Sequence, residues 1–151
     1  MKIYKTIASV LGIGYVGKGG GTIAALFYCM IWLLLPAAFS YSVWQIVITF
    51  FIIATGIVTG NKVDKVWGKD SSKVVIDEVA GMAIGLLFVP HKIIYVVIAL
   101  VLFRFFDIVK PLYIKKMEAL KGGLGVMMDD VLAGIYANIV LQIFIALTPL
   151  S

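Results

Sequence analysis

Five carboxylates that interrupt apolar segments are the residues of this chain best suited to chemistry. They fall in three short motifs, IDEVAG, FRFFDIVKP and MMDDV, and they are Asp77, Glu78, Asp107, Asp129 and Asp130. A charged side chain at the centre of a membrane helix costs about 2.5–3.5 kcal/mol on insertion scales, so such residues commonly bind ions, pair or do chemistry. Because Arg104 and Lys110 flank Asp107, the pattern suggests a metal-dependent site that acts on a phosphorylated lipid.

The composition places these motifs in an integral membrane protein. The chain has 151 residues, of which 62% are hydrophobic, with a mean hydropathy of +1.08. Soluble domains are about 45–50% apolar. The length suits one domain, residues 1–151, and the formal net charge of +5 is explained by membrane topology rather than by a nucleic-acid partner.

Long apolar runs set the predicted fold. They cover residues 23–39, 43–60, 74–89, 93–109 and 131–147, and polar segments at 61–73 and 110–130 separate them. We predict an all-α polytopic membrane helix bundle with about five membrane helices, one of them short. Residues 74–89 are expected to form either a full span or a deep re-entrant helix. Met1–Leu11 has apolar residues at helical spacing and predicts an interfacial N-terminal helix.

The distribution of cations predicts which ends of the helices face the cytoplasm. Of the 13 Lys and Arg residues, all but Lys92 and Arg104 lie in segments 1–22, 61–73 and 110–130. The positive-inside rule places these three segments in the cytoplasm. The acidic motifs then meet at the cytoplasmic face, because they stand at the start of the third span, the end of the fourth and the start of the fifth.

Each motif also has an ordinary structural interpretation. Acids such as Asp77 and Glu78 favour a helix N-terminus through the backbone dipole. Arg104 and Asp107 are three residues apart and can simply neutralise each other, and Asp129 or Asp130 can cap a helix. Adjacent carboxylates repel each other, however, and a divalent cation relieves that repulsion.

Glycine-rich segments offer two further possibilities. Residues 122–125 (GGLG) and the glycines before Thr22 could present backbone N–H groups to a phosphate. The G-x-x-x-G pairs Gly56/Gly60 and Gly81/Gly85 indicate close helix packing. His91 is the only histidine and lies on the opposite side from the acids, which excludes a histidine-rich zinc site and disfavours a catalytic triad.

At these same residues the chain resembles the phosphatidylglycerophosphatase A family of small membrane enzymes. The resemblance runs in order through VVIDEVAGM (74–82), LFRFFDIVKP (102–111) and KGGLGVMMDDVLAGIYA (121–137), and more loosely through GIGYVGKGGGTIAAL (12–26). In the last segment, the family usually has prolines where this chain has Val16–Gly20.

The resemblance implies a Mg²⁺-dependent phosphatase that converts phosphatidylglycerophosphate to phosphatidylglycerol. It implies an enzyme of the bacterial cytoplasmic (inner) membrane, with its active site facing the cytoplasm. The expected catalytic and metal-binding residues are Asp77, Glu78, Asp107, Asp129 and Asp130. The expected phosphate-binding residues are Arg104, Lys110, Lys69, Thr22 and Gly123. The nucleophile stays open between a metal-bound water and a carboxylate.

Two other functions remain possible from the residues alone. One is a small ion-coupled transporter or channel subunit, whose ion sites would lie nearer the bilayer midplane than these acids do. The other is a structural subunit whose acids pair with a partner protein.

Overall fold

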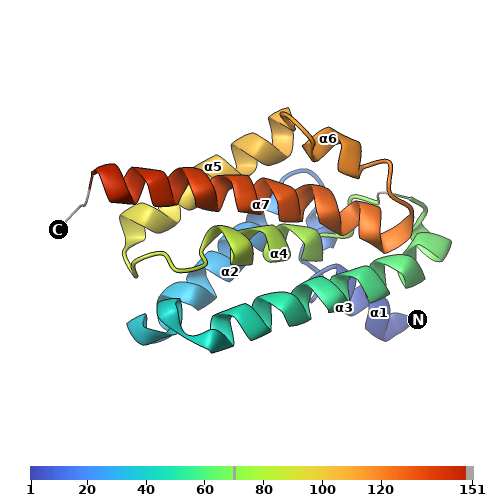
Figure 1. Ribbon diagram of the computed structural model, residues 1–151. Coiled ribbons are helices and arrows are strands. Elements are labelled where there is room, and N and C mark those ends of the chain that lie inside the picture. The colour runs from blue at the N-terminus through green and yellow to red at the C-terminus, as the bar shows by residue number, and fades with distance from the viewer. Residues whose placement is uncertain (70, 149–151) are drawn as a thin grey trace.

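A computed structural model describes residues 1–69 and 71–148 as a bundle of helices (Figure 1). In chain order these are α1 (Lys2–Ala8), the 3-10 helix η1 (Ile13–Val16), α2 (Gly20–Leu34), the 3-10 helix η2 (Ala37–Tyr41), α3 (Val43–Trp67), α4 (Ile76–Gly85), α5 (Ile93–Val109), α6 (Ile114–Met117) and α7 (Gly122–Leu147). The described residues include no strand, so the all-α class is confirmed.

Helices α3 and α7 form the long frame of the molecule. They have 25 and 26 residues and are each about 38 Å long at 1.5 Å per residue. Both are long and apolar enough to cross a membrane. They run antiparallel in contact, because a Cβ on Gly60 would lie 2.8 Å from the Cα of Gly123, and one on Gly56 would meet the Met127 side chain. The predicted packing role of this G-x-x-x-G pair is confirmed.

Helix α4 lies between α3 and α7 (Figure 1) and is buried along most of its length. It has 10 residues, or about 15 Å, half the thickness of a hydrocarbon core. Helix α4 by itself is therefore too short for a full crossing. The re-entrant alternative matches the buried, short helix.

Amide side chains of α3 and α7 donate hydrogen bonds to backbone carbonyls at the C-terminal end of α4. Gln45 on α3 donates to the carbonyl oxygen of Leu86 at 2.9 Å. On α7, Asn138 donates to Gly85 at 3.1 Å and Leu87 at 2.9 Å, and Gln142 donates to Leu87 and Phe88. Irregular backbone is tolerated at membrane depth only where protein groups replace water as hydrogen-bond partners. These amides let a helix end inside the bundle.

Glycines bring α4 and α7 into backbone contact. A Cβ on Gly134 would overlap the carbonyl oxygen of Gly81, and one on Gly81 would lie 2.8 Å from the carbonyl oxygen of Asp130. Gly85 differs, since a Cβ there would meet only the Met82 methyl at 3.9 Å. Of the predicted pair Gly81/Gly85, only Gly81 is required for close packing.

The remaining predicted spans fare differently. Segment 23–39 is not one helix, because α2 ends at Leu34 and the backbone is extended at Leu35, before Pro36. Segment 93–109 is the continuous 17-residue helix α5. Among the described residues, only α3 and α7 are both long and apolar enough to cross a membrane. The count of five spans therefore stays a prediction.

The predicted polar loop 110–130 is wrong in its second half. Helix α7 begins at Gly122, eight residues before the predicted loop ends. The glycines that suggested a loop instead let α7 approach α3 closely, since a Cβ on Gly123 would overlap the carbonyl oxygen of Ile57.

Candidate active site

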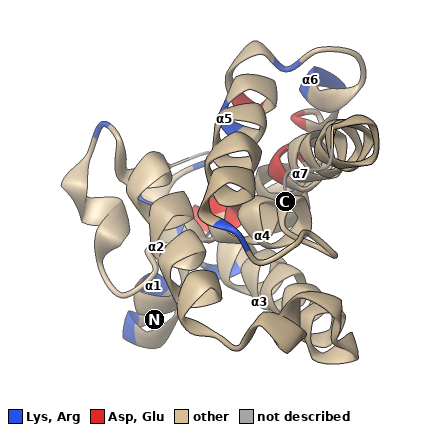
Figure 2. Ribbon diagram, turned by 90° about the vertical axis from the view of Figure 1, so that its left-hand side faces the viewer, with Lys and Arg blue, Asp and Glu red and all other residues tan. Residues whose placement is uncertain are grey.

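The acidic motifs meet where α4 begins, α5 ends and α7 passes (Figure 2). Asp77 and Glu78 stand in the first turn of α4, Asp107 in the last turn of α5, and Asp129 and Asp130 two turns into α7. Together they line a cavity of about 470 Å³. Its other lining residues are Gly17, Lys18, Gly19, Gly21, Ser71, Ser72, Val74, Val75, Arg104, Lys110, Glu118, Gly125 and Val126.

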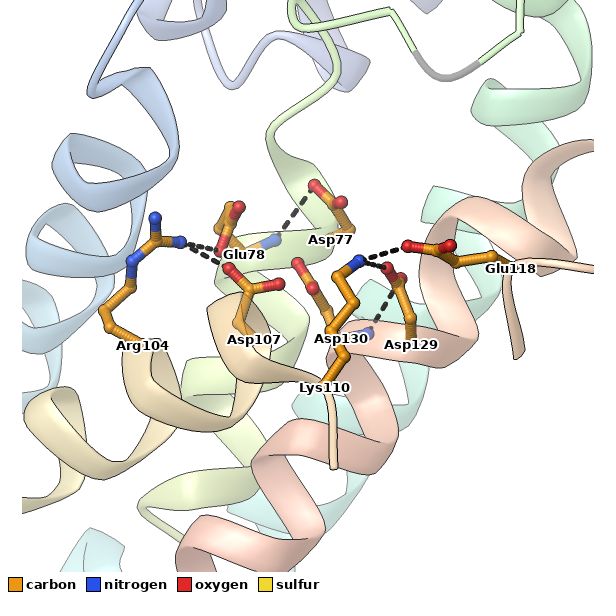
Figure 3. Close-up of polar contacts among 8 residues, drawn as sticks. All are labelled: Asp77, Glu78, Arg104, Asp107, Lys110, Glu118, Asp129 and Asp130. Atoms are coloured by element: carbon orange, nitrogen blue, oxygen red, sulfur yellow. Dashed lines mark hydrogen bonds and ion pairs between the residues drawn. The ribbon is translucent and has the colours of Figure 1, made fainter. Parts of the chain in front are cut away.

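Arg104 joins two of these helices (Figure 3). Its Nη1 donates to Oδ2 of Asp107 at 2.6 Å and to Oε2 of Glu78 at 2.9 Å. The side chains of Glu78 and Asp107 are both only 13% exposed. The predicted pairing of Arg104 with Asp107 is confirmed, and the same guanidinium also links α5 to the first turn of α4.

Lys110 makes the corresponding link to α7. It follows the last residue of α5 with a left-handed backbone (φ 53°). Its Nζ donates to Oδ2 of Asp129 at 2.8 Å and to Oε1 of Glu118 at 2.6 Å. Burial lowers the pKa of Lys110, but its hydrogen bonds to these two carboxylates outweigh that effect and hold the pKa above its ordinary value.

Asp130 lies at the centre of the cluster (Figure 3). It is only 1% exposed, and its Oδ2 has no hydrogen-bond partner. Carboxylate oxygens of Asp77, Asp129 and Asp130 lie within 4.8 Å of one another, and so do those of Glu78, Asp107 and Asp130. A buried carboxylate oxygen without a hydrogen-bond donor is energetically costly. A cation bound at Oδ2 of Asp130 would remove that cost.

Burial and mutual repulsion perturb the acids at the start of α4. Burial, followed by the charge of Asp107, raises the pKa of Glu78 to about 7, although Arg104 opposes the rise. Burial and the charges of Glu78 and Asp129 raise the pKa of Asp77 well above its ordinary value. Such shifts are typical of functional sites, where carboxylates crowd together for a purpose other than stability.

The cluster fits a hard divalent cation such as Mg²⁺. All candidate ligands are carboxylate oxygens, which Mg²⁺ prefers, and Oδ2 of Asp130 is an unpartnered buried oxygen in their midst. Asp77, Glu78, Asp107, Asp129 and Asp130 are the residues that could hold it.

The segment before α2 and the first turn of α2 close the cavity on the side of Glu78. A Cβ on Gly21 would lie 2.5 Å from Oε1 of Glu78, so only glycine allows the carboxylate to approach α2 this closely. Gly17 and Gly19 both have positive φ angles, 91° and 86°, and together they turn the chain so that Lys18 reaches the cavity.

Three predicted phosphate-binding residues lie outside this cavity lining. Thr22 is next to Gly21 but does not line the cavity, and the exposed Lys69 does not line it either. The N–H of Gly123 donates to Oδ1 of Asn61 at 2.7 Å, because this part of α7 packs on α3. His91 stacks on Trp32 with ring centroids 4.6 Å apart and is also absent from the lining.

The sequence interpretation missed several residues of the cavity. Glu118, Ser71 and Ser72 lie in short connections, where nothing in the spacing distinguishes them from ordinary polar residues. Lys18 was visible as the lone cation within a run of glycines. Its position in the segment that the resemblance already marked could have identified it.

Comparisons with known proteins show which family the chain belongs to. The sequence matches the phosphatidylglycerophosphatase A family over residues 6–145. It is 44% identical over 146 residues to a Bacteroides thetaiotaomicron protein provisionally named as a phosphatidylinositol-3-phosphatase, covering 91% of this chain and 90% of the relative. It is 47% identical over 73 residues to phosphatidylglycerophosphatase A of Haemophilus influenzae, covering 47% and 45% of the two chains. No solved structure matches. The chain is therefore a phosphatase and belongs to the phosphatidylglycerophosphatase A family.

Proposed function

We propose that the protein removes the terminal phosphate of phosphatidylglycerophosphate, giving phosphatidylglycerol, in a reaction that requires Mg²⁺. The observation that carries the proposal is the buried Asp130, whose unpartnered Oδ2 lies among four further carboxylates with Arg104 and Lys110 at their edge. Family membership supports a phosphatase on a lipid substrate.

The carboxylates hold the metal ion, and the cations bind the phosphate. When bound, Mg²⁺ polarises the phosphoryl group and offsets the charge that develops on its oxygens. Arg104 uses only Nη1 for its two carboxylate partners. A guanidinium has five N–H donors in a planar fork, so Nη2 and Nε retain donors for phosphate oxygens. Lys110 supplies a point charge on the other side of Asp107.

The site lies near one membrane interface in this proposal. Asp129 is seven residues after Gly122, the first residue of α7, and is therefore about 10 Å along a helix about 39 Å long. A transport site would be expected nearer the midplane, which favours the phosphatase over the ion-coupled transporter. The positive-inside rule places this end of α7 in the cytoplasm, where a bacterial inner-membrane enzyme would meet its lipid.

A second substrate deserves a direct test. The Bacteroides relative aligns over nine tenths of both chains, and its name specifies phosphatidylinositol 3-phosphate. Both lipids carry a phosphate monoester on a headgroup joined to the lipid by a phosphodiester, so the same cations and metal ligands suit either one. They differ in headgroup, a flexible glycerol in one and an inositol ring in the other.

The experiment is phosphate release by the purified protein from each lipid in mixed micelles. Mg²⁺-dependent release with a higher kcat/KM for phosphatidylglycerophosphate supports the proposal. Full activity in EDTA refutes the metal requirement. A higher kcat/KM for phosphatidylinositol 3-phosphate refutes the proposed substrate and identifies the inositol lipid as the preferred one. Thr22→Ala and Lys69→Gln, which alter residues outside the cavity lining, test whether either residue binds phosphate after all.

A further inference from the structure

We propose that the acidic cluster holds two divalent cations, which share Asp130 as a common ligand. This inference rests on the proposed function, because it specifies the metal content of the same site.

The carboxylates form two overlapping groups. The first consists of Asp77, Asp129 and Asp130, and the second of Glu78, Asp107 and Asp130. Ligand oxygens within each group lie no more than 4.8 Å apart, so each group can surround one ion. Asp130 is the only residue that the two groups share, and it lies between them (Figure 3).

The number of carboxylates is too large for one magnesium ion. Mg²⁺ is usually bound through one or two protein carboxylates and keeps several of its waters. Five carboxylates around a single ion would displace nearly all of that water. Two ions, each with a few carboxylates, match the ordinary coordination of Mg²⁺ and the pattern of phosphatases with paired metal ions.

Asp130 has the properties that a shared ligand needs. It is 1% exposed, and its Oδ2 has no hydrogen-bond partner. Its backbone is fixed by close contact between its carbonyl oxygen and Gly81 of α4. The two oxygens of one carboxylate can each contact a different ion. Asp130 is therefore a buried carboxylate held rigidly between both groups.

The existing ion pairs leave ligand oxygens in both groups. Arg104 contacts Oε2 of Glu78 and Oδ2 of Asp107, which leaves Oδ1 of Asp107 and, beside Gly21, Oε1 of Glu78. The Oδ1 of Asp77 accepts the Glu78 N–H at 3.0 Å, which leaves its Oδ2. Both oxygens of Asp129 already accept hydrogen bonds, Oδ1 from the Asp130 N–H at 2.9 Å and Oδ2 from Lys110 at 2.8 Å, so Asp129 would bind an ion through a second lone pair of one of these oxygens.

The charge of the substrate also favours two ions. With the six carboxylates of the cavity ionised, its three cations Lys18, Arg104 and Lys110 leave three negative charges in excess. One divalent cation leaves the cluster negative, and it would repel a phosphate monoester that carries up to two negative charges. A second cation makes the cluster positive and therefore attractive to that anion.

Manganese is a suitable probe, because Mn²⁺ uses the same oxygen ligands as Mg²⁺ and is paramagnetic. The purified full-length protein in detergent is titrated with Mn²⁺ by equilibrium dialysis, and the loaded protein is examined by electron paramagnetic resonance. We expect two equivalents and a spin-coupled spectrum. Asp77→Asn and Asp107→Asn should each retain one equivalent with an uncoupled spectrum, and Asp130→Asn should lose the coupling. Glu118→Gln, which removes a cavity carboxylate outside both groups, should retain two coupled ions.

A wild-type protein that binds a single equivalent overturns the inference. It is equally overturned if Asp77→Asn and Asp107→Asn, each with a parent-like circular dichroism spectrum, both lose all bound manganese. The lipid assay separates this result from the proposed function. Mg²⁺-dependent phosphate release by a protein with one metal ion refutes the pair and keeps the function. Two coupled ions without phosphate release from either lipid support the pair and refute the function.

Discussion

Substituting Gly134 with alanine should reduce activity and stability, although Gly134 does not line the active-site cavity. Gly134 lies one turn after Asp130 on α7, and a Cβ there would overlap the carbonyl oxygen of Gly81 and lie 3.1 Å from its carbonyl carbon. Optimal contacts between heavy atoms are about 3.5–4.0 Å, so α4 and α7 must separate by about 1 Å. Overpacking of this kind costs about 1–3 kcal/mol, or a fall in Tm of roughly 2–12 °C at this chain length.

The same displacement should reduce catalysis, because α4 carries Asp77 and Glu78 and α7 carries Asp130. A shift of about 1 Å in a catalytic arrangement can cost on the order of 10²-fold in rate. Gly85→Ala is the matched control, since its Cβ would meet only the Met82 methyl at 3.9 Å. It should keep parent activity and gain about 0.5–1 kcal/mol from replacing a helical glycine. The assays are thermal unfolding in detergent and Mg²⁺-dependent phosphate release. If Gly134→Ala matches Gly85→Ala in both, the contact between α4 and α7 does not position the site.

Three further substitutions test individual interactions. Arg104→Lys keeps the charge but loses the planar fork, so phosphate release should fall at least 10²-fold while Tm changes little; parent-like turnover would make Arg104 a structural partner only. Asp130→Asn should reduce turnover by on the order of 10³-fold yet raise Tm in EDTA, because it removes a buried, unpaired charge. Glu118→Gln is the control for Asp130→Asn, since the exposed salt bridge between Glu118 and Lys110 contributes at most about 1 kcal/mol to stability. A lower Tm for Asp130→Asn would contradict the argument that repulsion among the acids destabilises the fold. Asn138→Ala removes the side-chain donor of the buried Gly85 carbonyl and leaves the Leu87 carbonyl with Gln142 alone, so it should lower stability by about 1–3 kcal/mol. An unchanged Tm would show that these hydrogen bonds contribute little.

The convergence of the acids could be predicted because it depends only on the alternation of helix directions. Acids at the start of one helix, the end of the next and the start of a third must face the same side, whatever the lengths of the helices. Arg104 and Asp107 were predictable as a pair from their spacing, and they do form an ion pair. Contacts between distant segments, such as that between Arg104 and Glu78, depend on helix packing, and the spacing of residues along the chain does not specify it.

The short length of α4 could not be read from hydropathy. An apolar run of 16 residues looks the same whether it crosses a membrane or is buried among other helices. Likewise, Gly122 and Gly123 could open a loop or allow two helices to touch, since a missing Cβ serves both purposes. The sequence does carry one signal of a helix end inside the bundle, namely the amides Gln45, Asn138 and Gln142 within predicted spans that are otherwise almost wholly apolar.

Those amides and the acidic motifs occupy opposite ends of the same helix. At its C-terminal end, the amides donate to the backbone carbonyls of Leu86 and Leu87, and so hold α4 inside the bundle. At its N-terminal end, α4 presents Asp77 and Glu78 beside Asp107 and Asp130, where their repulsion disfavours the fold until a cation binds. The neutral hydrogen bonds and the backbone contact at Gly81 therefore offset the repulsion among the acids. These three amides therefore fix where α4 ends between α3 and α7. The short length of α4 is thus part of how the site is positioned.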